Sequence, residues 1–167
     1  ISGLPKNTWC YHIEASVFGE GTAYAVFEGH AKHDYTPYTY KTTDYGKTWQ
    51  SIITPDVDGF VRNIQEDFKN ENLLFLGTEK GLYITIDGGA NWSHFTNNMQ
   101  SVAGHFMDIN KKTNSLVMAT HGRGVIILDD ITPLRQINQE VVAKDVHFCD
   151  LKPAIIEEQS SFGTTAT

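Results

Sequence analysis

Short apolar runs that alternate with polar residues recur along the chain, and residues that favour turns separate them. Clear examples lie at residues 23–27, 73–77 and 116–120. Alternation with a period of two, bounded by Gly, Asp, Asn or Pro, predicts half-buried β-strands rather than helices. The pattern predicts strands at residues 10–16, 22–28, 38–43, 49–53, 61–66, 73–77, 82–86, 92–95, 105–109, 116–120 and 125–128.

One short phrase occurs twice within this pattern. Residues 42–49 and 85–92 both read Thr-x-Asp-x-Gly-x-x-Trp, with the two copies 43 residues apart, and we call them the first and second Asp phrases. A third copy is degenerate, because Asp130 stands where the repeat predicts an Asp but Arg135 replaces the Trp. A period in the forties with Gly and Trp in register is typical of four-stranded propeller blades.

The repeat predicts an all-β protein built from β-propeller blades of four antiparallel strands. We expect three blades near residues 9–54, 60–96 and 104–132, inside a propeller segment of residues 4–133. A loop is expected at the insertion of residues 29–37. Residues 134–153 should form a short helix, capped by Asn138, and a strand at 146–149, while residues 154–167 have the composition of a linker or tail.

Three blades do not close a propeller, which usually has at least four. An open arc exposes unpaired strand edges at both ends. The remaining propeller blades, or another chain, are therefore expected as partners that cover the open edges.

Composition and charge narrow the class of protein. The 167 residues are 40% apolar and contain no apolar run of membrane-spanning length, so no transmembrane segment is expected. A net charge of -7 with scattered basic residues argues against nucleic acid as a partner. Cys10 and Cys149 lie far apart without metal-site spacing, and neither a metal nor a cofactor is expected.

The residues of the Asp phrase have a structural explanation. Gly accepts the positive φ of a tight turn, Asp accepts backbone N–H groups across it, and Thr adds a hydroxyl. The Trp should be buried between neighbouring blades. A carboxylate occupied by backbone donors is a poor general base, so we expect structural rather than catalytic roles. These residues are Thr42, Asp44, Gly46, Trp49, Thr85, Asp87, Gly89 and Trp92.

The phrases at residues 38–49, 74–83 and 120–134 resemble those of Asp-box propellers, also called bacterial neuraminidase repeat propellers. This family includes sialidases, xyloglucanases and sortilin-type receptors. The chain is most similar to the C-terminal blades of large secreted bacterial proteins labelled sortilin-like or glycosyl hydrolase. The resemblance implies a secreted or cell-surface protein of bacterial origin, with a glycan or a cell-surface protein as its partner.

Blade topology places the Asp phrases between the third and fourth strands. The resemblance implies a ligand site on the opposite face, where the loops between the second and third strands and between blades lie. The binding candidates there are His30, His33, Asp34, Tyr35, Asp56, Asp58, Glu79, His121 and Arg123.

Each group of candidates has a simpler alternative. His30, His33 and Asp34 are chemically able to ligate a metal, but such a polar loop is more often solvated. Asp56 and Asp58 resemble the opening of a calcium loop whose later ligands are absent, which favours turn-forming acids. The turn that carries His121 and Arg123 either recognises a carboxylate or sugar hydroxyl or is simply a hairpin turned by its glycines.

No catalytic residue is expected in this chain. A sialidase needs three arginines around its substrate carboxylate, and no family motif links Arg62, Arg123 and Arg135. A xyloglucanase-like hydrolase needs two carboxylates facing one cleft, usually from distant blades. The sequence therefore predicts a non-catalytic structural and binding segment of a secreted propeller, for protein or carbohydrate. The alternative is part of a glycoside hydrolase whose catalytic carboxylates lie mainly on missing blades.

Overall fold

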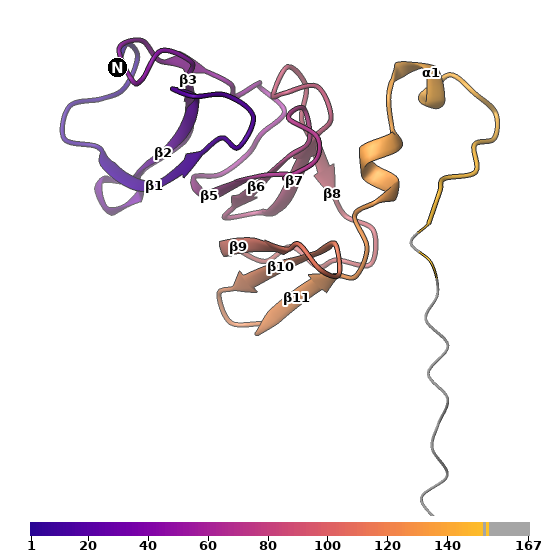
Figure 1. Cartoon of the computed structure of the whole chain (residues 1–167). Coiled ribbons are helices and arrows are strands. Elements are labelled where there is room, and N and C mark those ends of the chain that lie inside the picture. The colour runs from indigo at the N-terminus through magenta and orange to yellow at the C-terminus, as the bar shows by residue number, and fades with distance from the viewer. Residues whose placement is uncertain (152, 154–167) are drawn as a thin grey trace, which may run out of the picture.

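Three antiparallel sheets form the described part of the chain, residues 1–151 and 153, in a computed structural model (Figure 1). Within each sheet the strands follow chain order, as in propeller blades, which confirms the predicted all-β fold class. The first sheet contains β1 (Trp9–Ala15), β2 (Ala23–Gly29), β3 (Asp34–Thr42) and β4 (Gln50–Ser51). The second contains β5 (Val61–Glu66), β6 (Leu74–Thr78), β7 (Gly81–Thr85) and β8 (Ser93–Phe95). The third contains β9 (Gly104–Asn110), β10 (Ser115–Thr120) and β11 (Val125–Leu128).

The second sheet is covered on both faces, so β6 and β7 are buried along their whole length. Alternate side chains of β6 point to opposite neighbours. Leu74 and Leu76 join a core with Tyr24 of the first sheet. Phe75 joins a second core with Met107 of the third sheet. This explains why these strands read as continuous apolar runs in the sequence.

Both Asp phrases form tight turns that occupy their own carboxylates. Asp87 Oδ1 accepts hydrogen bonds from the backbone N–H of Asn91 at 2.9 Å and from Thr85 Oγ1 at 2.7 Å. Asp44 Oδ1 does the same with the backbone of Thr48, at 2.8 Å. These two carboxylates are therefore fixed within their turns. We call the side of the molecule that bears these turns the phrase face.

The third copy keeps one hydrogen bond that its degenerate sequence does not reveal. In each copy, the residue after the Asp donates its backbone N–H to a carbonyl in the turn between the first two strands of its sheet. The donor–acceptor pairs are Tyr45 to Gly21, Gly88 to Asn72 and Ile131 to Asn114, each at 2.9 Å. The third turn is therefore held like the other two.

The two Trp residues of the Asp phrases differ in burial. Trp92 is 4% exposed and donates its indole N–H to the carbonyl oxygen of Ile52, in the preceding sheet, at 2.7 Å. Trp49 is only half-buried and donates to Gly46 O of its own turn at 3.0 Å. The expected burial of Trp49 between blades is wrong for the described chain, because no sheet among the described residues precedes the first.

Arg135 stands where the third copy would carry its Trp, and it makes the contact to the preceding sheet by different chemistry. Its Nε and Nη2 donate to the carboxylate of Asp67 at 2.8 and 2.7 Å, and Nη1 donates to Asn114 Oδ1 at 2.7 Å. Asp67 is fully buried in the turn after β5. A buried, bidentate ion pair thus links the third copy to the second sheet.

After β11, the chain forms a 3₁₀ turn, η2 (Pro133–Gln136), and one helical turn, α1 (Gln139–Val142). Asn138 caps α1 by accepting from Val141 N at 2.9 Å, as predicted. The strand expected at 146–149 is absent, and the third sheet has no fourth strand among the described residues. Both backbone polar groups of Asp150 are instead hydrogen-bonded to the side-chain amide of Gln136, so they pair with a side chain and not with a neighbouring strand. The expected tail of residues 154–167 lies outside the described residues.

The insertion at residues 29–37 is more ordered than a loop. It forms a 3₁₀ turn, η1 (His30–Lys32), and β3 already begins at Asp34, opposite Gly29. The prediction of a loop up to Pro37 was therefore too long.

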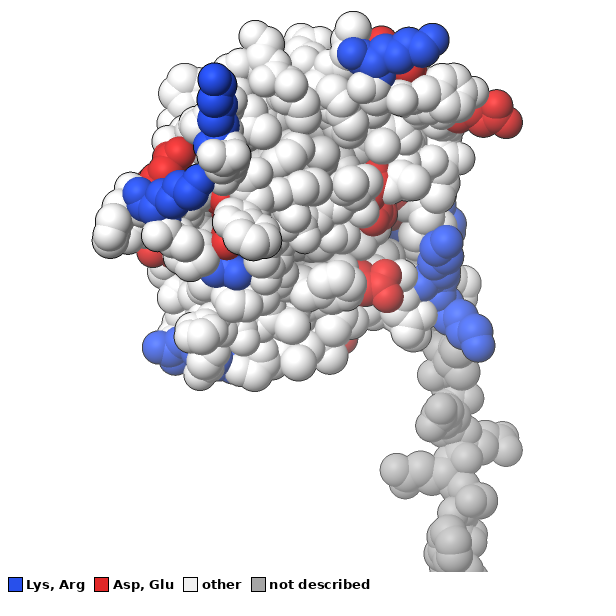
Figure 2. Space-filling view, turned by 90° about the vertical axis from the view of Figure 1, so that its left-hand side faces the viewer, with Lys and Arg blue, Asp and Glu red and all other residues white. Residues whose placement is uncertain are grey.

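Among the described residues, the first sheet has one face that no other sheet covers. Ile13, Ala25 and Tyr40 are register partners on this face; Ile13 is 63% exposed, whereas Ala25 and Tyr40 are buried. Figure 2 views this side of the molecule, where Lys, Arg, Asp and Glu lie mostly toward the rim and uncharged residues fill the middle. Within the described residues, no helix is long and apolar enough to cross a membrane.

Candidate functional site

The face opposite the phrase face carries the turns between second and third strands and the crossovers between sheets. Backbone hydrogen bonds tie turn and crossover together: Glu79 N donates to Phe60 O at 3.0 Å, and His121 N donates to Ala103 O at 2.9 Å. Because each turn is fixed to a crossover, side chains from all three sheets are held close together here. We call this side the cluster face.

An ion-pair network lies at the centre of the cluster face. The Glu28 carboxylate, at the end of β2, is 2.8 Å from His30 Nδ1 and 3.1 Å from Arg62 Nε of β5. Glu28 is 8% exposed, so its charge is largely removed from water and depends on these partners.

Aromatic rings pack around the guanidinium of Arg62. Its Cζ lies over the ring of Tyr11 at 4.7 Å and over that of Phe60 at 5.0 Å. His30 stacks on Phe60 at 5.0 Å, and Tyr35, which is 51% exposed, approaches the same ring at 6.2 Å. Contacts of this kind between Arg and aromatic rings restrict the orientation of the guanidinium.

Two imidazoles from the third sheet complete the arrangement. His105, in β9, stacks on His121, in the β10–β11 turn, at 5.1 Å between ring centres. Burial lowers the pKa of His105, and the positive charges of Arg62 and His121 lower it further, whereas Glu28 opposes the shift. We call Tyr11, Glu28, His30, Phe60, Arg62, His105 and His121 together the Arg62 cluster.

Several polar atoms near this site are buried without a hydrogen-bond partner among the described residues. Arg62 Nε and Glu28 Oε2 are close but not aligned for a hydrogen bond. Both amide atoms of Asn63, which is 1% exposed, also lack a partner. Buried polar groups are normally satisfied, so these atoms are exceptions among the described residues.

Large rings are exposed beside the cluster. Trp9 is the register partner of Glu28, which puts both side chains on one face of the first sheet, and its ring is 70% exposed. Phe106 of β9 is 57% exposed and meets His12 of β1 edge to face at 6.2 Å. Trp9 and Tyr11 belong to β1 of the first sheet, and Phe106 belongs to β9 of the third.

The structure brings together only some of the residues that the sequence nominated. His30, Tyr35 and His121 belong to the cluster or touch it, and Glu79 is half-buried in the turn bonded to Phe60. The other nominated residues lie apart from the cluster. His33 follows η1 with φ 62°, and Asp34 accepts hydrogen bonds from Thr36 N and Tyr38 Oη. Asp56 accepts a hydrogen bond from Thr54 Oγ1, Asp58 is exposed, and Arg123 lines a separate groove beside Met99.

No three His, Cys, Asp or Glu side chains within residues 1–151 and 153 are arranged to hold a metal ion. Cys10 and Cys149 are both free thiols.

Sequence reasoning missed Glu28, Phe60, Arg62 and His105. Glu28, Arg62 and His105 lie at or next to the end of a strand on the cluster face, in segments that the pattern predicted to be strand, and Phe60 directly precedes the predicted strand at 61–66. The available indication was a charged residue, Glu28, at the end of the apolar run of β2, which requires a partner when buried. The partner, Arg62, belongs to another sheet and cannot be identified from local pattern.

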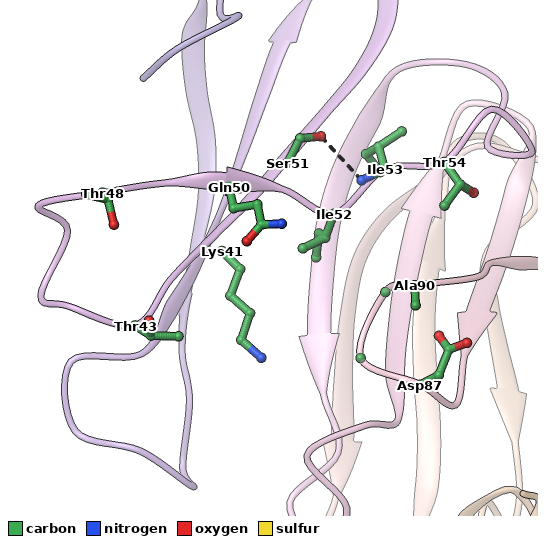
Figure 3. Close-up of a pocket in the computed structure, with 12 residues that line it drawn as sticks. Lys41, Thr43, Thr48, Gln50, Ser51, Ile52, Ile53, Thr54, Asp87 and Ala90 are labelled. Carbon is green, nitrogen blue, oxygen red and sulfur yellow. Dashed lines mark hydrogen bonds between the residues drawn. The ribbon is translucent and has the colours of Figure 1, made fainter.

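On the phrase face, a polar groove of about 440 Å³ separates the outer strand of the first sheet from the second Asp phrase (Figure 3). Lys41, Gln50 and Ser51 line one side, and Asp87 with Ala90 lines the other. Asp87 is occupied by its turn donors, so this groove offers no free carboxylate.

A second pocket, of about 320 Å³, lies between the strands β1, β5 and β9 and contains several acids. Glu66 is saturated, because it accepts from Ser16 Oγ, Val17 N and Tyr24 Oη. Glu14 accepts from Gln65 Nε2 at 2.7 Å and lies 3.7 Å from His12 Nε2, and within the described part of the chain Asp108 accepts only from the adjacent backbone N–H of Ile109. Two carboxylates with spare acceptor capacity therefore line one pocket.

Comparison with known proteins places the fold among β-propellers. No family model matches the sequence, and no curated protein does. Among solved structures, an ancestral GH74 enzyme superposes with a TM-score of 0.56 at 18% identity, over 68% of this chain and 14% of that one. The GH74 enzyme of Niastella koreensis superposes with a TM-score of 0.59 at 15% identity, over 72% of this chain and 21% of that one.

A third match is YCF48 bound to D1 peptide, with a TM-score of 0.51 at 18% identity, over 73% of this chain and 37% of that one. The chain thus spans well under half of each of these three structures. At these identities the likeness shows the fold alone, which is an arc of propeller blades.

Proposed function

We propose that the chain is a non-catalytic binding segment of a larger secreted β-propeller, and that a protein or peptide contacts its cluster face. The observation that carries this is the set of exposed Trp9, Tyr11 and Phe106 rings beside the buried Arg62 network. Tyr, Trp and Arg dominate the energetically important positions of protein interfaces. Secretion is supported by the resemblance of the Asp phrases to those of secreted proteins.

The larger propeller is supported by the contrast between Trp92 and Trp49. Trp92 packs on the sheet before its own, whereas no sheet of the described residues lies on Trp49, which bonds within its own turn. A further four-stranded sheet on the open face of the first sheet would give Trp49 the environment of Trp92. Ile13, which is 63% exposed on that face, would be buried by such a sheet.

Selection of ligands against the chain tests the binding face. A displayed peptide library panned against the chain should yield peptides whose affinity falls roughly tenfold or more in Trp9→Ala, as expected for an aromatic anchor. Tyr45→Ala is the matched control, because that ring is 73% exposed on the phrase face. A selected peptide should protect β1, β5 and β9 from hydrogen exchange.

Three results would count against the proposal. The first is that the selected peptides all bind Trp9→Ala unchanged, and the second is that protection is confined to the phrase face. Binding that appears only on a glycan array, and that Trp9→Ala removes, would point to carbohydrate as the ligand instead.

A glycoside hydrolase is the second candidate, and the pocket with Glu14 and Asp108 favours it, since hydrolysis uses two carboxylates. Xyloglucan and sialosides would be incubated with the chain and with Glu14→Gln and Asp108→Asn. We expect no hydrolysis by any of them. Turnover by the chain that disappears in both variants would establish the enzyme and overturn the binding-only function.

A further inference from the structure

The two buried arginines of this chain differ in how far their donors are used. Arg135 donates from Nε, Nη1 and Nη2 to Asp67 and Asn114, so its fork is filled. Arg62 is also largely buried, but within residues 1–151 and 153 no group accepts a hydrogen bond from its Nη1 or Nη2, and its Nε is misaligned with Glu28. The guanidinium of Arg62 is therefore held in place, while its two terminal nitrogens donate to no acceptor among the described residues.

The position of this fork is set by groups from several elements. Tyr11 of β1 and Phe60, just before β5, pack on the guanidinium, and Glu28 holds its Nε side. Rings and ion pair together restrict the rotation of Arg62, which lowers the entropy lost when a ligand binds.

The charge around the fork also suits an anion. His30 and Arg62 both contact the Glu28 carboxylate, so that negative charge is already balanced. His105 and His121 lie on the third-sheet side of Arg62, close enough that Arg62 and His121 disfavour protonation of His105. An added negative charge there relieves this repulsion.

We propose that Arg62 binds a carboxylate group of the ligand, assisted by the His105–His121 pair. The inference rests on the proposed function, because it names the chemical group that the cluster face recognises. A planar carboxylate matches two donors of a guanidinium fork. A single carboxylate also matches the charge better than a phosphate dianion, since the one arginine is already paired with Glu28.

Binding should strengthen as the pH falls. The charged groups that act on His105 are Glu28 from the first sheet, Arg62 from β5 and His121 from the third sheet. A carboxylate bound beside His105 stabilises its protonated ring and raises its depressed pKa. Affinity is therefore highest with His105 protonated and declines as the pH rises through the His105 pKa of the complex.

Nuclear magnetic resonance of the histidine rings in the full chain tests the inference. The probe is acetyl-Ala-Ala with a free carboxylate, and its C-terminal amide and inorganic phosphate are the comparison ligands. The free acid should shift the ring signals of His105 and His121 and raise the pKa of His105, while the amide should not. In Arg62→Gln, affinity for the free acid should fall roughly tenfold or more, because a charged hydrogen bond is lost.

Two further variants separate recognition from folding. Arg62→Gln leaves Glu28 buried without its ion-pair partner, so the double variant Glu28→Gln with Arg62→Gln removes both charges together. Arg123→Gln, on a neighbouring exposed turn, should bind like the original chain. Equal binding of the amide or of phosphate, or unchanged binding by the double variant, would overturn the carboxylate site.

The outcome is independent of the peptide selection described above. Selected peptides that bind through Trp9 without needing Arg62 would refute only the carboxylate site. Ring shifts with the free acid, without any selected peptide, would refute only the protein-binding function.

Discussion

Truncation of the two phrase tryptophans should have unequal effects, although both occupy the same position of the same phrase. Trp92→Ala removes a ring that is 4% exposed, together with the indole donor to Ile52 O. Such a change costs about 3–5 kcal/mol of unfolding free energy. Trp49→Ala removes a half-buried ring whose donor bonds only within its own turn, and should cost about 1–2 kcal/mol.

The measurement is thermal and urea denaturation of the chain and both variants, followed by circular dichroism. For a chain of this length, each kcal/mol shifts the melting temperature by about 2–4 °C, so Trp92→Ala should lose about 6–20 °C and Trp49→Ala distinctly less. Trp92→Phe provides an intermediate case, because it keeps most of the ring but leaves Ile52 O without its donor, at a cost of about 1–3 kcal/mol.

Equal losses for the two alanine variants would refute the reasoning. They would mean that burial against the preceding sheet contributes nothing beyond what the turn itself requires. A larger loss for Trp49→Ala would show that another part of the chain covers this ring in solution.

Other contacts yield further expectations. Arg135→Ala leaves Asp67 as an uncompensated buried charge and should lower the free energy of unfolding by about 3–5 kcal/mol, as measured by urea denaturation. A decrease of less than about 1 kcal/mol would contradict the role of the ion pair between Arg135 and Asp67. Gly89 and Gly122 both have positive φ, but only a Cβ at Gly89 would meet the preceding sheet, at 3.0 Å, so Gly89→Ala should lower the melting temperature more than Gly122→Ala. Burial alone would raise the pKa of Asp87, yet hydrogen bonds lower it below its ordinary value. The stability that Asp87 contributes is therefore present above the pKa of the unfolded state and is lost as the pH falls through the pKa of the folded state. Asp87→Ala should accordingly reduce the loss of stability on the acid side.

The 43-residue repeat and the alternating pattern were sufficient for the architecture. They record contacts that are short in sequence, such as the bond between Asp87 and Asn91 four residues later, or the cap that Asn138 offers to Val141. Turn chemistry of this kind depends on residue type and spacing, which can be read directly from the chain. The helix at 139–142 and the sheet order follow from the same local rules.

The candidate site could be predicted only in part. His30 and His121 were nominated because topology sends their turns to one face, and topology follows from the repeat. Glu28 and Arg62 were not, since their pairing joins residues 34 positions apart in different sheets. No local pattern records which strand ends meet.

The sequence by itself determined that this protein is made of propeller blades and which turns its Asp phrases close. Tertiary structure alone decided that Trp92 is buried while Trp49 is not, that Arg135 takes over the place of a Trp through Asp67, and that an unfilled arginine fork lies among the rings of the cluster face. The physical reason is that burial and charge pairing depend on which sheet stands next to which, and this is a property of the packed sheets rather than of any segment.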